Sequence, residues 1–210
     1  MRHECTKQVI DKRSTKAVYM NNFLSIGHVN PIPALLQIKS NPDLWDMFIE
    51  RKNTYADNMP HQGVSDIWVR TRDRSEFNGS WDDFRGPHDP VWYPAADLLP
   101  AVKDIAFEIM HMVRGERLGA VLITKVPAGE QVKPHIDKFW NAETFNTKVM
   151  VSLESHPDQA LCYEEGSYSA MPGECVWFRN DVMHWVTNDS PVDRITLIVC
   201  TQTDRRSICQ

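Results

Sequence analysis

The stretch LGAVLITKVPAGEQVKPHID, residues 118–137, contains two short runs of apolar and β-branched residues separated by a Pro-Ala-Gly turn. Such runs are typical of short strands, and the turn residues between them allow the chain to reverse. Further runs of the same kind follow at residues 145–153, 160–163, 175–178, 184–187 and 194–201. We find no helical period among them. Seven short strands at this spacing predict a double-sheet barrel of the jelly-roll type.

The residues before this stretch predict helices and one further strand. Apolar side chains recur at helical spacing over residues 102–113, and Gly115 stands where a helix C-terminus favours glycine. Residues 64–71 alternate with a period of two, as the first strand of a main sheet would. Residues 17–61 predict a short strand and two helices, the second over residues 44–49.

We therefore expect a single domain, 1–210, that is mainly β with flanking helices. Its N-terminal part, residues 1–117, contributes helices, the first strand and a packing helix. Its core, residues 118–203, is a jelly-roll barrel. A chain of 210 residues is long enough to bury such a core without a disulfide or a structural metal.

Composition narrows the class of protein. Hydrophobic residues make up 42% and charged residues 24% of the chain, as in globular domains. The formal net charge of −5 argues against a nucleic-acid partner, and no apolar run is long enough for a membrane span. The N-terminus carries charges where a secretory signal would be apolar, so we expect a cytoplasmic protein. The five cysteines are scattered and odd in number, which favours reduced thiols.

His135 and Asp137 are two residues apart on a predicted strand, so both side chains point to one face. His184 follows after enough chain for several strands to pass and return. Two histidines and one carboxylate on an octahedral ion leave three positions open, as in non-haem Fe(II) oxygenases. The other interpretation is a surface pair at a strand end together with a core histidine.

The same H-x-D pattern occurs a second time, at His156 and Asp158. Pro157 lies between them and cannot donate to a sheet ladder, so Ser155-His-Pro-Asp reads as a turn whose side chains diverge. We interpret His156 and Asp158 as turn residues and not as metal ligands.

Arg194 opens a buried apolar strand, and Thr196 lies on the same face. A buried guanidinium has to find an anion, and a guanidinium beside a hydroxyl suits the carboxylate of a ligand. The other interpretation is a salt bridge from Arg194 to Asp193 or Asp181.

Two longer segments carry a resemblance to a known family. These are TKVPAGEQVKPH, residues 124–135, and PGECVWFRNDVMHWVTN, residues 172–188, and a closing strand follows from Arg194. Over about residues 118–203 they resemble the aspartyl/asparaginyl β-hydroxylase family of Fe(II)- and 2-oxoglutarate-dependent oxygenases. Its best-known animal members lack a carboxylate ligand, whereas Asp137 here completes a triad.

The resemblance implies a cupin-like double-stranded β-helix that uses Fe(II), with 2-oxoglutarate and O2 as cosubstrates. It implies that His135 and His184 bind iron and that Arg194 binds the distal carboxylate of 2-oxoglutarate. Thr124 stands in place of a family serine that hydrogen-bonds the cosubstrate, and Lys148 stands where an arginine often reaches it. The implied reaction hydroxylates a C–H bond of an amino-acid residue or a free amino acid, and decarboxylates 2-oxoglutarate to succinate and CO2.

Substrate contacts have weaker signals in the sequence. The candidates are Trp140, Asn141, Arg70 and Arg72. The first two belong to the loop after Asp137, and a surface loop pinned by buried aromatics explains them equally well. Period two places the two arginines on one strand face with Asp66 and Trp68, where solvated charges are the interpretation we favour. Residues 78–94 are rich in glycine, proline and aspartate and predict a long loop that is a candidate lid.

Three kinds of protein therefore remain open. The first is a hydroxylase of a protein, a peptide or a free amino acid, or a related oxygenase that acts on another small molecule. The second is a metal-binding cupin of different activity, which would keep the triad but not need Arg194. The third is a β-sandwich interaction module without a metal. The sequence does not indicate the oligomeric state.

Overall fold

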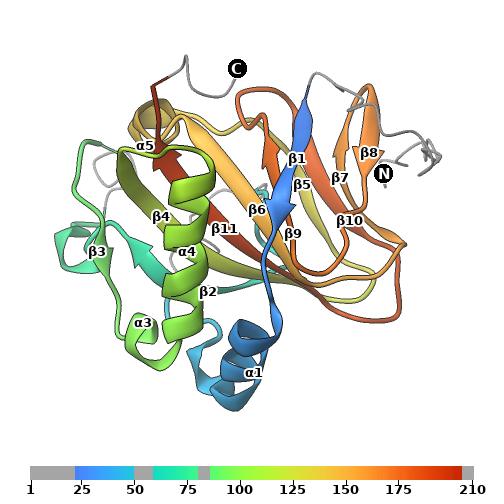
Figure 1. Ribbon diagram of the computed structural model, residues 1–210, viewed down its shortest axis with the longest axis horizontal. Coiled ribbons are helices and arrows are strands. Elements are labelled where there is room, and N and C mark those ends of the chain that lie inside the picture. The colour runs from blue at the N-terminus through green and yellow to red at the C-terminus, as the bar shows by residue number, and fades with distance from the viewer. Residues whose placement is uncertain (1–21, 50–58, 80–85, 205–210) are drawn as a thin grey trace.

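The computed structural model describes residues 22–49, 59–79 and 86–204, which form two antiparallel sheets with most of the helices on one side (Figure 1). The larger sheet has the order β1-β9-β6-β11-β4-β2-β3 and the smaller one β5-β10-β7-β8. The strands of the larger sheet, in that order, are Phe23–His28, Glu174–Phe178, Thr147–Glu154, Arg194–Gln202, Arg117–Val126, Ser65–Thr71 and Val91–Trp92. Those of the smaller sheet are Gln131–His135, His184–Asn188, Gln159–Tyr163 and Gly166–Tyr168.

Four α-helices and two 3₁₀ turns complete the described part of the chain. They are α1 (Ile32–Ser40), α3 (Ala95–Leu98), α4 (Pro100–Met112) and α5 (Phe139–Thr144), with 3₁₀ turns at Pro42–Leu44 and Arg74–Glu76. The predicted fold class is confirmed: the molecule is mainly β with flanking helices, and the two sheets face each other as in a jelly roll. No helix in these segments has the length and apolar character that a membrane span requires.

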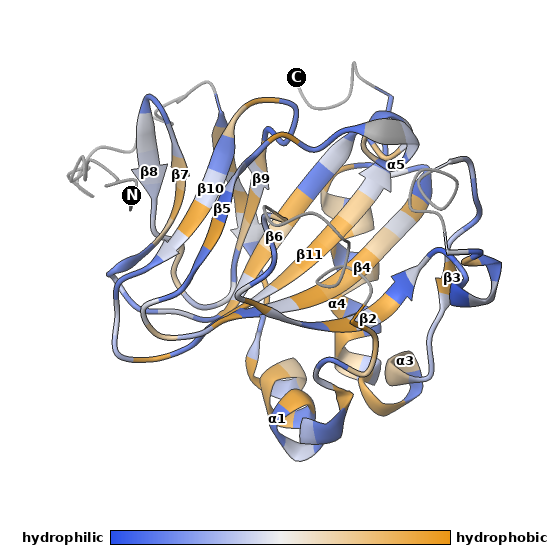
Figure 2. Cartoon of the chain, turned by 180° about the vertical axis from the view of Figure 1, so that it is seen from behind, coloured by the Kyte–Doolittle hydropathy of each residue, from blue (hydrophilic) through white to orange (hydrophobic). Residues whose placement is uncertain are grey.

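The larger sheet is buried on both faces, and its strands alternate between two environments. Along β11, Ile195, Leu197 and Val199 belong to the core that packs against α1, α3 and α4. The alternate residues of the strand line a cavity on the other face: Arg194, Thr196, Ile198 and Cys200. Strands β4 and β6 alternate in the same way, and Figure 2 shows the cavity side of these strands. Because successive side chains point to opposite faces, one strand builds both the hydrophobic core and the cavity wall.

The helix predicted over residues 44–49 does not form. The chain makes a 3₁₀ turn at Pro42–Leu44, and Asp46 then adopts a left-handed conformation with φ 56°. Asp46 donates its backbone N–H to the carbonyl of Asp66, and its side chain accepts from the N–H of Asp66. These bonds to β2 replace the helical hydrogen bonds. The apolar residues at helical spacing instead include side chains that make tertiary contacts, as Phe48 does with Trp68.

The end of α4 also differs from the prediction. Arg114, and not Gly115, takes the left-handed conformation after the helix, with φ 52°. A Cβ at Gly115 would lie 2.7 Å from the sulfur of Met110 and 3.0 Å from Thr201 Oγ1, so a larger residue there would require the end of the Met110 side chain to move. The short elements α5, β3 and β8 were also not predicted; β3 lies within the expected loop at residues 78–94, of which residues 80–85 are outside the described part.

The cysteines only partly match the expectation of thiols. Cys175 and Cys200 are buried thiols, and burial raises the pKa of the Cys175 thiol to about 12. Cys162 is disulfide-bonded, so the prediction of five reduced thiols is wrong at this position. Cys5 and Cys209 lie outside the described residues.

Candidate metal and cosubstrate site

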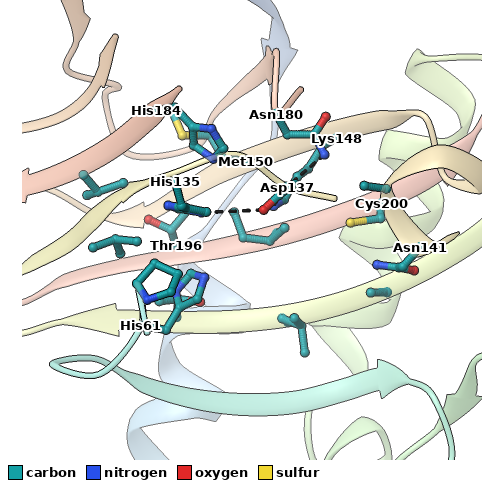
Figure 3. A pocket seen from close by; sticks show the side chains of 18 of the residues that line it. His61, His135, Asp137, Asn141, Lys148, Met150, Asn180, His184, Thr196 and Cys200 are labelled. Atoms are coloured by element: carbon teal, nitrogen blue, oxygen red, sulfur yellow. Dashed lines mark hydrogen bonds and ion pairs between the residues drawn. The ribbon is translucent and has the colours of Figure 1, made fainter. Parts of the chain in front are cut away.

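The three predicted metal ligands meet between the two sheets. His135 ends β5, His184 begins β10, and the two residues are direct partners in the antiparallel register. Asp137 follows two residues after His135, and one ligand atom from each of the three residues lies within 4.8 Å of the others. Figure 3 shows the three side chains converging on one side of the cavity. The sequence prediction of a two-histidine, one-carboxylate cluster is therefore confirmed in space.

Both imidazoles are oriented by the backbone. The Nδ1 of His135 lies 2.8 Å from the carbonyl of Lys133, and the Nδ1 of His184 lies 2.9 Å from the carbonyl of Val182. A carbonyl only accepts, so each Nδ1 carries the proton and each Nε2 keeps a free lone pair. Burial, with the charges around it, lowers the pKa of His184 to about 4, so this ring is neutral at pH 7. Neutral imidazoles fixed in this tautomer suit metal coordination.

The carboxylate of Asp137 has two different oxygens. Its Oδ2 accepts from Lys148 Nζ at 2.5 Å and from Asn180 Nδ2 at 3.1 Å. Its Oδ1 lies 3.5 Å from His135 Nε2. Burial alone would raise the pKa of this carboxyl, but the charge and hydrogen bond of Lys148 outweigh burial and hold it well below its ordinary value. Asp137 is therefore an anion, as a metal ligand must be.

Arg194 is a buried cation, 6% exposed, at the start of β11. Within the described residues no carboxylate pairs with it, and its Nη2 lies 3.5 Å from the sulfur of Met150. The alternative salt bridges are not formed: Asp181 pairs with Arg179, and Asp193 accepts from the N–H of Ala128. Burial lowers the pKa of Arg194 to about 10, which still leaves it charged at pH 7.

Two threonines lie near Arg194, and they differ in their hydrogen bonds. Thr196 is 1% exposed, and its hydroxyl is without a hydrogen-bond partner. Thr124 faces Thr196 in the register of β4 and β11, and its hydroxyl donates to the buried Asp66 at 2.9 Å. The hydroxyl of Thr196 can therefore donate a hydrogen bond to a ligand, whereas the hydroxyl of Thr124 already donates to Asp66. Asp66 is 2% exposed, so treating it as a solvated strand charge is wrong.

A cavity of about 460 Å³ connects these groups. Its walls include the metal triad, Arg194, Thr124, Thr196 and Lys148. Ligand sites of several hundred cubic ångströms are typical for small molecules. The cavity thus has room for a ligand between Arg194 and the triad, and it continues toward α5 and β2.

Of the four candidate substrate residues, Arg72 and Asn141 line the cavity, and Arg70 and Trp140 are not among its lining residues. A register shift between Trp68 and Arg70 interrupts the period of two, so Arg70 stacks on Trp92 at 5.0 Å instead. Trp140 packs on His88 and Phe145. In the part of residues 78–94 that the structure describes, His88 lines the cavity.

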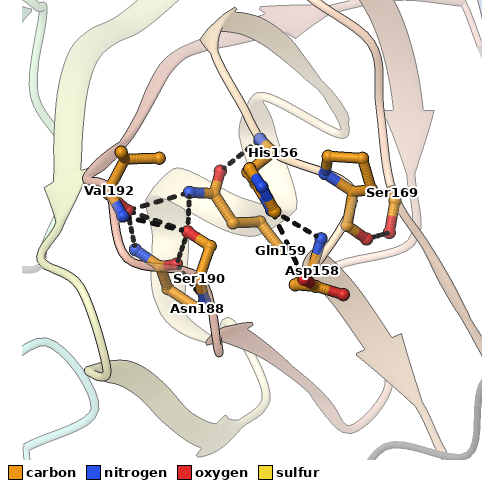
Figure 4. A network of polar contacts seen from close by, with 8 residues as sticks. His156, Asp158, Gln159, Ser169, Asn188, Ser190 and Val192 are labelled. Atoms are coloured by element: carbon orange, nitrogen blue, oxygen red, sulfur yellow. Dashed lines mark hydrogen bonds and ion pairs between the residues drawn. The ribbon is translucent and has the colours of Figure 1, made fainter.

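The second H-x-D pair lies away from the cavity, in the turn between β6 and β7 (Figure 4). His156 Nδ1 lies 3.5 Å from Asp158 Oδ2 and accepts from the N–H of Asp158, so the side chains meet instead of diverging. Gln159 holds this turn by accepting from the N–H of His156 and donating to Ser190. The pair is part of a turn, as predicted, and it is not among the groups of three metal-ligating side chains found in the described chain.

Among the cavity residues to which the sequence assigned no role, Asn180, Met150 and His61 lie against the predicted site residues. Asn180 lies in the turn before His184, and its contact with Asp137 depends on how β5 and β10 pair. Met150 lies on β6 and points into the cavity. The period of two alone does not show which face of this strand borders a cavity. The ring of His61 lies edge-on to His135 at 5.2 Å, from a segment that the sequence left without a strand or helix.

The donor set fits a ferrous ion and a dianionic chelate. Two imidazole nitrogens and one carboxylate oxygen would hold the metal and leave three positions open. A buried arginine without an anion and a hydroxyl without a partner mark where a ligand carboxylate fits. Together with the jelly-roll fold, this arrangement defines the class of Fe(II)- and 2-oxoglutarate-dependent oxygenases.

The chain belongs to the aspartyl/asparaginyl β-hydroxylase family, whose sequence profile matches residues 55–203. It is an enzyme of the hydroxylase type. No curated protein sequence matches it at a significant level.

Solved structures share the fold at low sequence identity. A prolyl hydroxylase from Trichoplax adhaerens, in complex with a peptide fragment of the hypoxia inducible factor oxygen degradation domain, is 12% identical, with a TM-score of 0.57. The match covers 87% of this chain and 84% of that one. An oxidoreductase of the 2OG-Fe(II) oxygenase family from Burkholderia pseudomallei is also 12% identical, with a TM-score of 0.48 over 68% of this chain and 70% of that one.

Proposed function

We propose that this protein is a dioxygenase that uses Fe(II), 2-oxoglutarate and O2 to hydroxylate a C–H bond of an amino acid, either free or within a peptide or protein. His135, Asp137 and His184 would hold the iron. Arg194 and Thr196 would bind the distal carboxylate of 2-oxoglutarate. The observation that carries the proposal is the buried, unpaired guanidinium of Arg194 in the same cavity as the triad.

The reaction balances as substrate C–H, O2 and 2-oxoglutarate giving substrate C–OH, succinate and CO2. One oxygen atom enters the substrate and the other enters the new carboxylate of succinate. The cosubstrate supplies the two electrons that O2 needs beyond those from the C–H bond. The iron, when bound, supplies the activation of O2, which is the step that no side chain here performs.

The chain's own residues orient the reactants and exclude water. The backbone carbonyls of Lys133 and Val182 fix the two imidazoles, so the ligand atoms are in place before the metal binds. Arg194 and Thr196 set the direction of the cosubstrate by holding its far end. The apolar side chains Leu161 and Ile198 line the same cavity and limit the access of water.

Two of the cosubstrate contacts expected from the sequence are assigned differently within this proposal. The hydroxyl of Thr124 donates a hydrogen bond to Asp66, so Thr196 is the better donor to the cosubstrate. Lys148 pairs with Asp137, so within this proposal we assign it to that carboxylate instead of to 2-oxoglutarate. Every proposed ligand lies within residues 118–203, and we keep the single-domain arrangement as part of the proposal.

The test is conversion of 2-oxoglutarate to succinate by the full chain loaded with Fe(II) in air, measured by NMR with and without pooled amino acids and peptides. We expect substrate-stimulated succinate formation that His135→Ala abolishes. His156→Ala is the matched control, because it removes the histidine of the other H-x-D pair, and it should retain the activity. Absence of succinate from protein that binds Fe(II) stoichiometrically would contradict the proposal.

The same assay separates a cupin of different activity. Such a protein would keep the triad but have no use for Arg194. Full activity in Arg194→Ala, with any substrate, would favour that alternative over the oxygenase.

A further inference from the structure

Asp137 is held at three points by two residues that are not themselves metal ligands. Its N–H donates to the carbonyl of Asn180 at 2.9 Å. Its Oδ2 accepts from Asn180 Nδ2 at 3.1 Å and from Lys148 Nζ at 2.5 Å. Only Oδ1 faces the imidazole of His135, at 3.5 Å. The two carboxylate oxygens are therefore assigned to different partners, and Figure 3 shows Lys148 and Asn180 together on the far side of Asp137.

Both partners come from elements that fix their position. Lys148 lies on β6 opposite Cys200 of β11, and its ammonium lies 5.4 Å from the centre of the Phe178 ring. Its side chain is only 18% exposed. Asn180 is 9% exposed, two residues after the end of β9. A half-buried lysine between a carboxylate and an aromatic face has few other places to go.

We propose that Lys148 and Asn180 are positioning residues that occupy Oδ2 of Asp137, so that this carboxylate offers the metal Oδ1 alone. This inference rests on the proposed function and adds a determinant of the metal's coordination number. Lys148 thereby takes a role different from the cosubstrate contact that the family resemblance implied.

The consequence concerns the number of open positions on the metal. A carboxylate can bind a metal through one oxygen or through both. With Asp137 bound through one oxygen, three positions of an octahedral ion stay open, two for a chelating cosubstrate and one for O2. A carboxylate bound through both oxygens would take one of these positions. Holding Oδ2 therefore protects the vacancy that the reaction requires.

The test counts exchangeable water ligands on Mn(II) bound to the full chain without 2-oxoglutarate, by water-proton relaxation. Lys148→Met and Asn180→Ala each release one hold on Oδ2, and we expect the relaxation per bound Mn(II) to fall by about a third, from three waters toward two. Lys148→Arg keeps a charged donor and should restore the wild-type value. Lys138→Met is the matched control, because it removes an exposed lysine of the same cavity, whereas the lysine on Oδ2 of Asp137 is Lys148.

The affinity of the Mn(II)-loaded variants for 2-oxoglutarate gives a second readout. Loss of an open position should weaken it about 10-fold or more, which is the usual effect of removing a partner of a metal ligand. Unchanged water counts in both Lys148→Met and Asn180→Ala would overturn the inference, even if 2-oxoglutarate bound more weakly, because a direct cosubstrate contact would give that pattern. Failure of the wild-type chain to bind Mn(II) at all would instead overturn the proposed function.

Discussion

Arg194→Met should make the ligand-free protein more stable while it destroys cosubstrate binding. Arg194 is a fully buried cation, and within the described chain no carboxylate compensates its charge. Methionine has a similar length and no charge, so it removes the burial cost and keeps most of the packing around Met150. An arginine kept for stability alone would behave in the opposite way.

The magnitude follows from the pKa. Burial lowers the pKa of Arg194 from 12.5 to about 10, and each tenfold change in the proton equilibrium corresponds to about 1.4 kcal/mol. A cation whose pKa is lower in the folded state destabilises that state at every pH below the folded value, so the whole cost is present at pH 7. The upper limit is roughly 3 kcal/mol, and we expect a gain of about 1–3 kcal/mol in Arg194→Met. For a chain of this size that raises Tm by about 2–10 °C.

The assay is thermal and urea unfolding of the metal-free chain at pH 7, with and without Mn(II) and 2-oxoglutarate. At 1,000 times its Kd, a ligand adds about 4.1 kcal/mol to the stability of a protein that binds it, which is more than the gain expected from the substitution. The wild type should gain this amount from 2-oxoglutarate and the variant should not, so the order of their Tm values should reverse. Arg179→Met is the control, because Arg179 forms an exposed pair with Asp181 and its loss should change stability by less than about 0.5 kcal/mol. A ligand-free Arg194→Met that is less stable than the wild type by more than about 1 kcal/mol would refute the reasoning.

Other substitutions test the surroundings of the site by unfolding and by calorimetric binding of 2-oxoglutarate. Thr196→Val removes a buried hydroxyl without a partner, so stability should hold or rise by about 1 kcal/mol while 2-oxoglutarate binds roughly 10-fold more weakly; unchanged affinity would exclude Thr196 from the cosubstrate site. Thr124→Val removes the hydroxyl that donates to buried Asp66 and should lower the free energy of unfolding by about 1–3 kcal/mol. Thr124→Ser retains the donor and is the control in the same unfolding measurement. Gly119→Ala would place a Cβ 2.5 Å from the ring of Phe145 and should cost about 1–3 kcal/mol; no loss of stability would show that the ring can move.

The fold could be predicted because most of its strands are long enough to stand out as runs of apolar and β-branched residues between turn residues. In β11, Ile195 and Leu197 face the helices, while Thr196 and Ile198 face the cavity. Both faces carry apolar side chains, and Arg194 and Thr196 are polar residues on the cavity face. The three residues of β8 and the six of α5 are too short to show any period. The helix expected near Asp46 failed because hydrogen bonds to β2 replaced local ones, and a local pattern does not contain that information.

The ligands could be predicted for the same local reason, and their partners could not. His135 and Asp137 are two positions apart, as are Arg194 and Thr196. That spacing places Arg194 and Thr196 on one side of β11, and it keeps Asp137, which follows the end of β5, close to His135. The pairing of Lys148 and Asn180 with Asp137 joins three separate segments. It depends on the register of the two sheets and on the path of the turn after β9. The burial of Asp66 likewise follows from its position opposite Thr124 in the sheet, not from its own neighbours in sequence.

The most direct test of the account is an anaerobic titration of the Fe(II)-loaded chain with 2-oxoglutarate, followed by the visible charge-transfer absorption of the Fe(II)–2-oxoglutarate chelate. We predict a band that saturates at one equivalent of cosubstrate, is absent in His184→Ala, and needs far more cosubstrate in Arg194→Met. The absence of this band from wild-type protein that holds one equivalent of Fe(II) would contradict the assignment of the triad and Arg194 to a single oxygenase site.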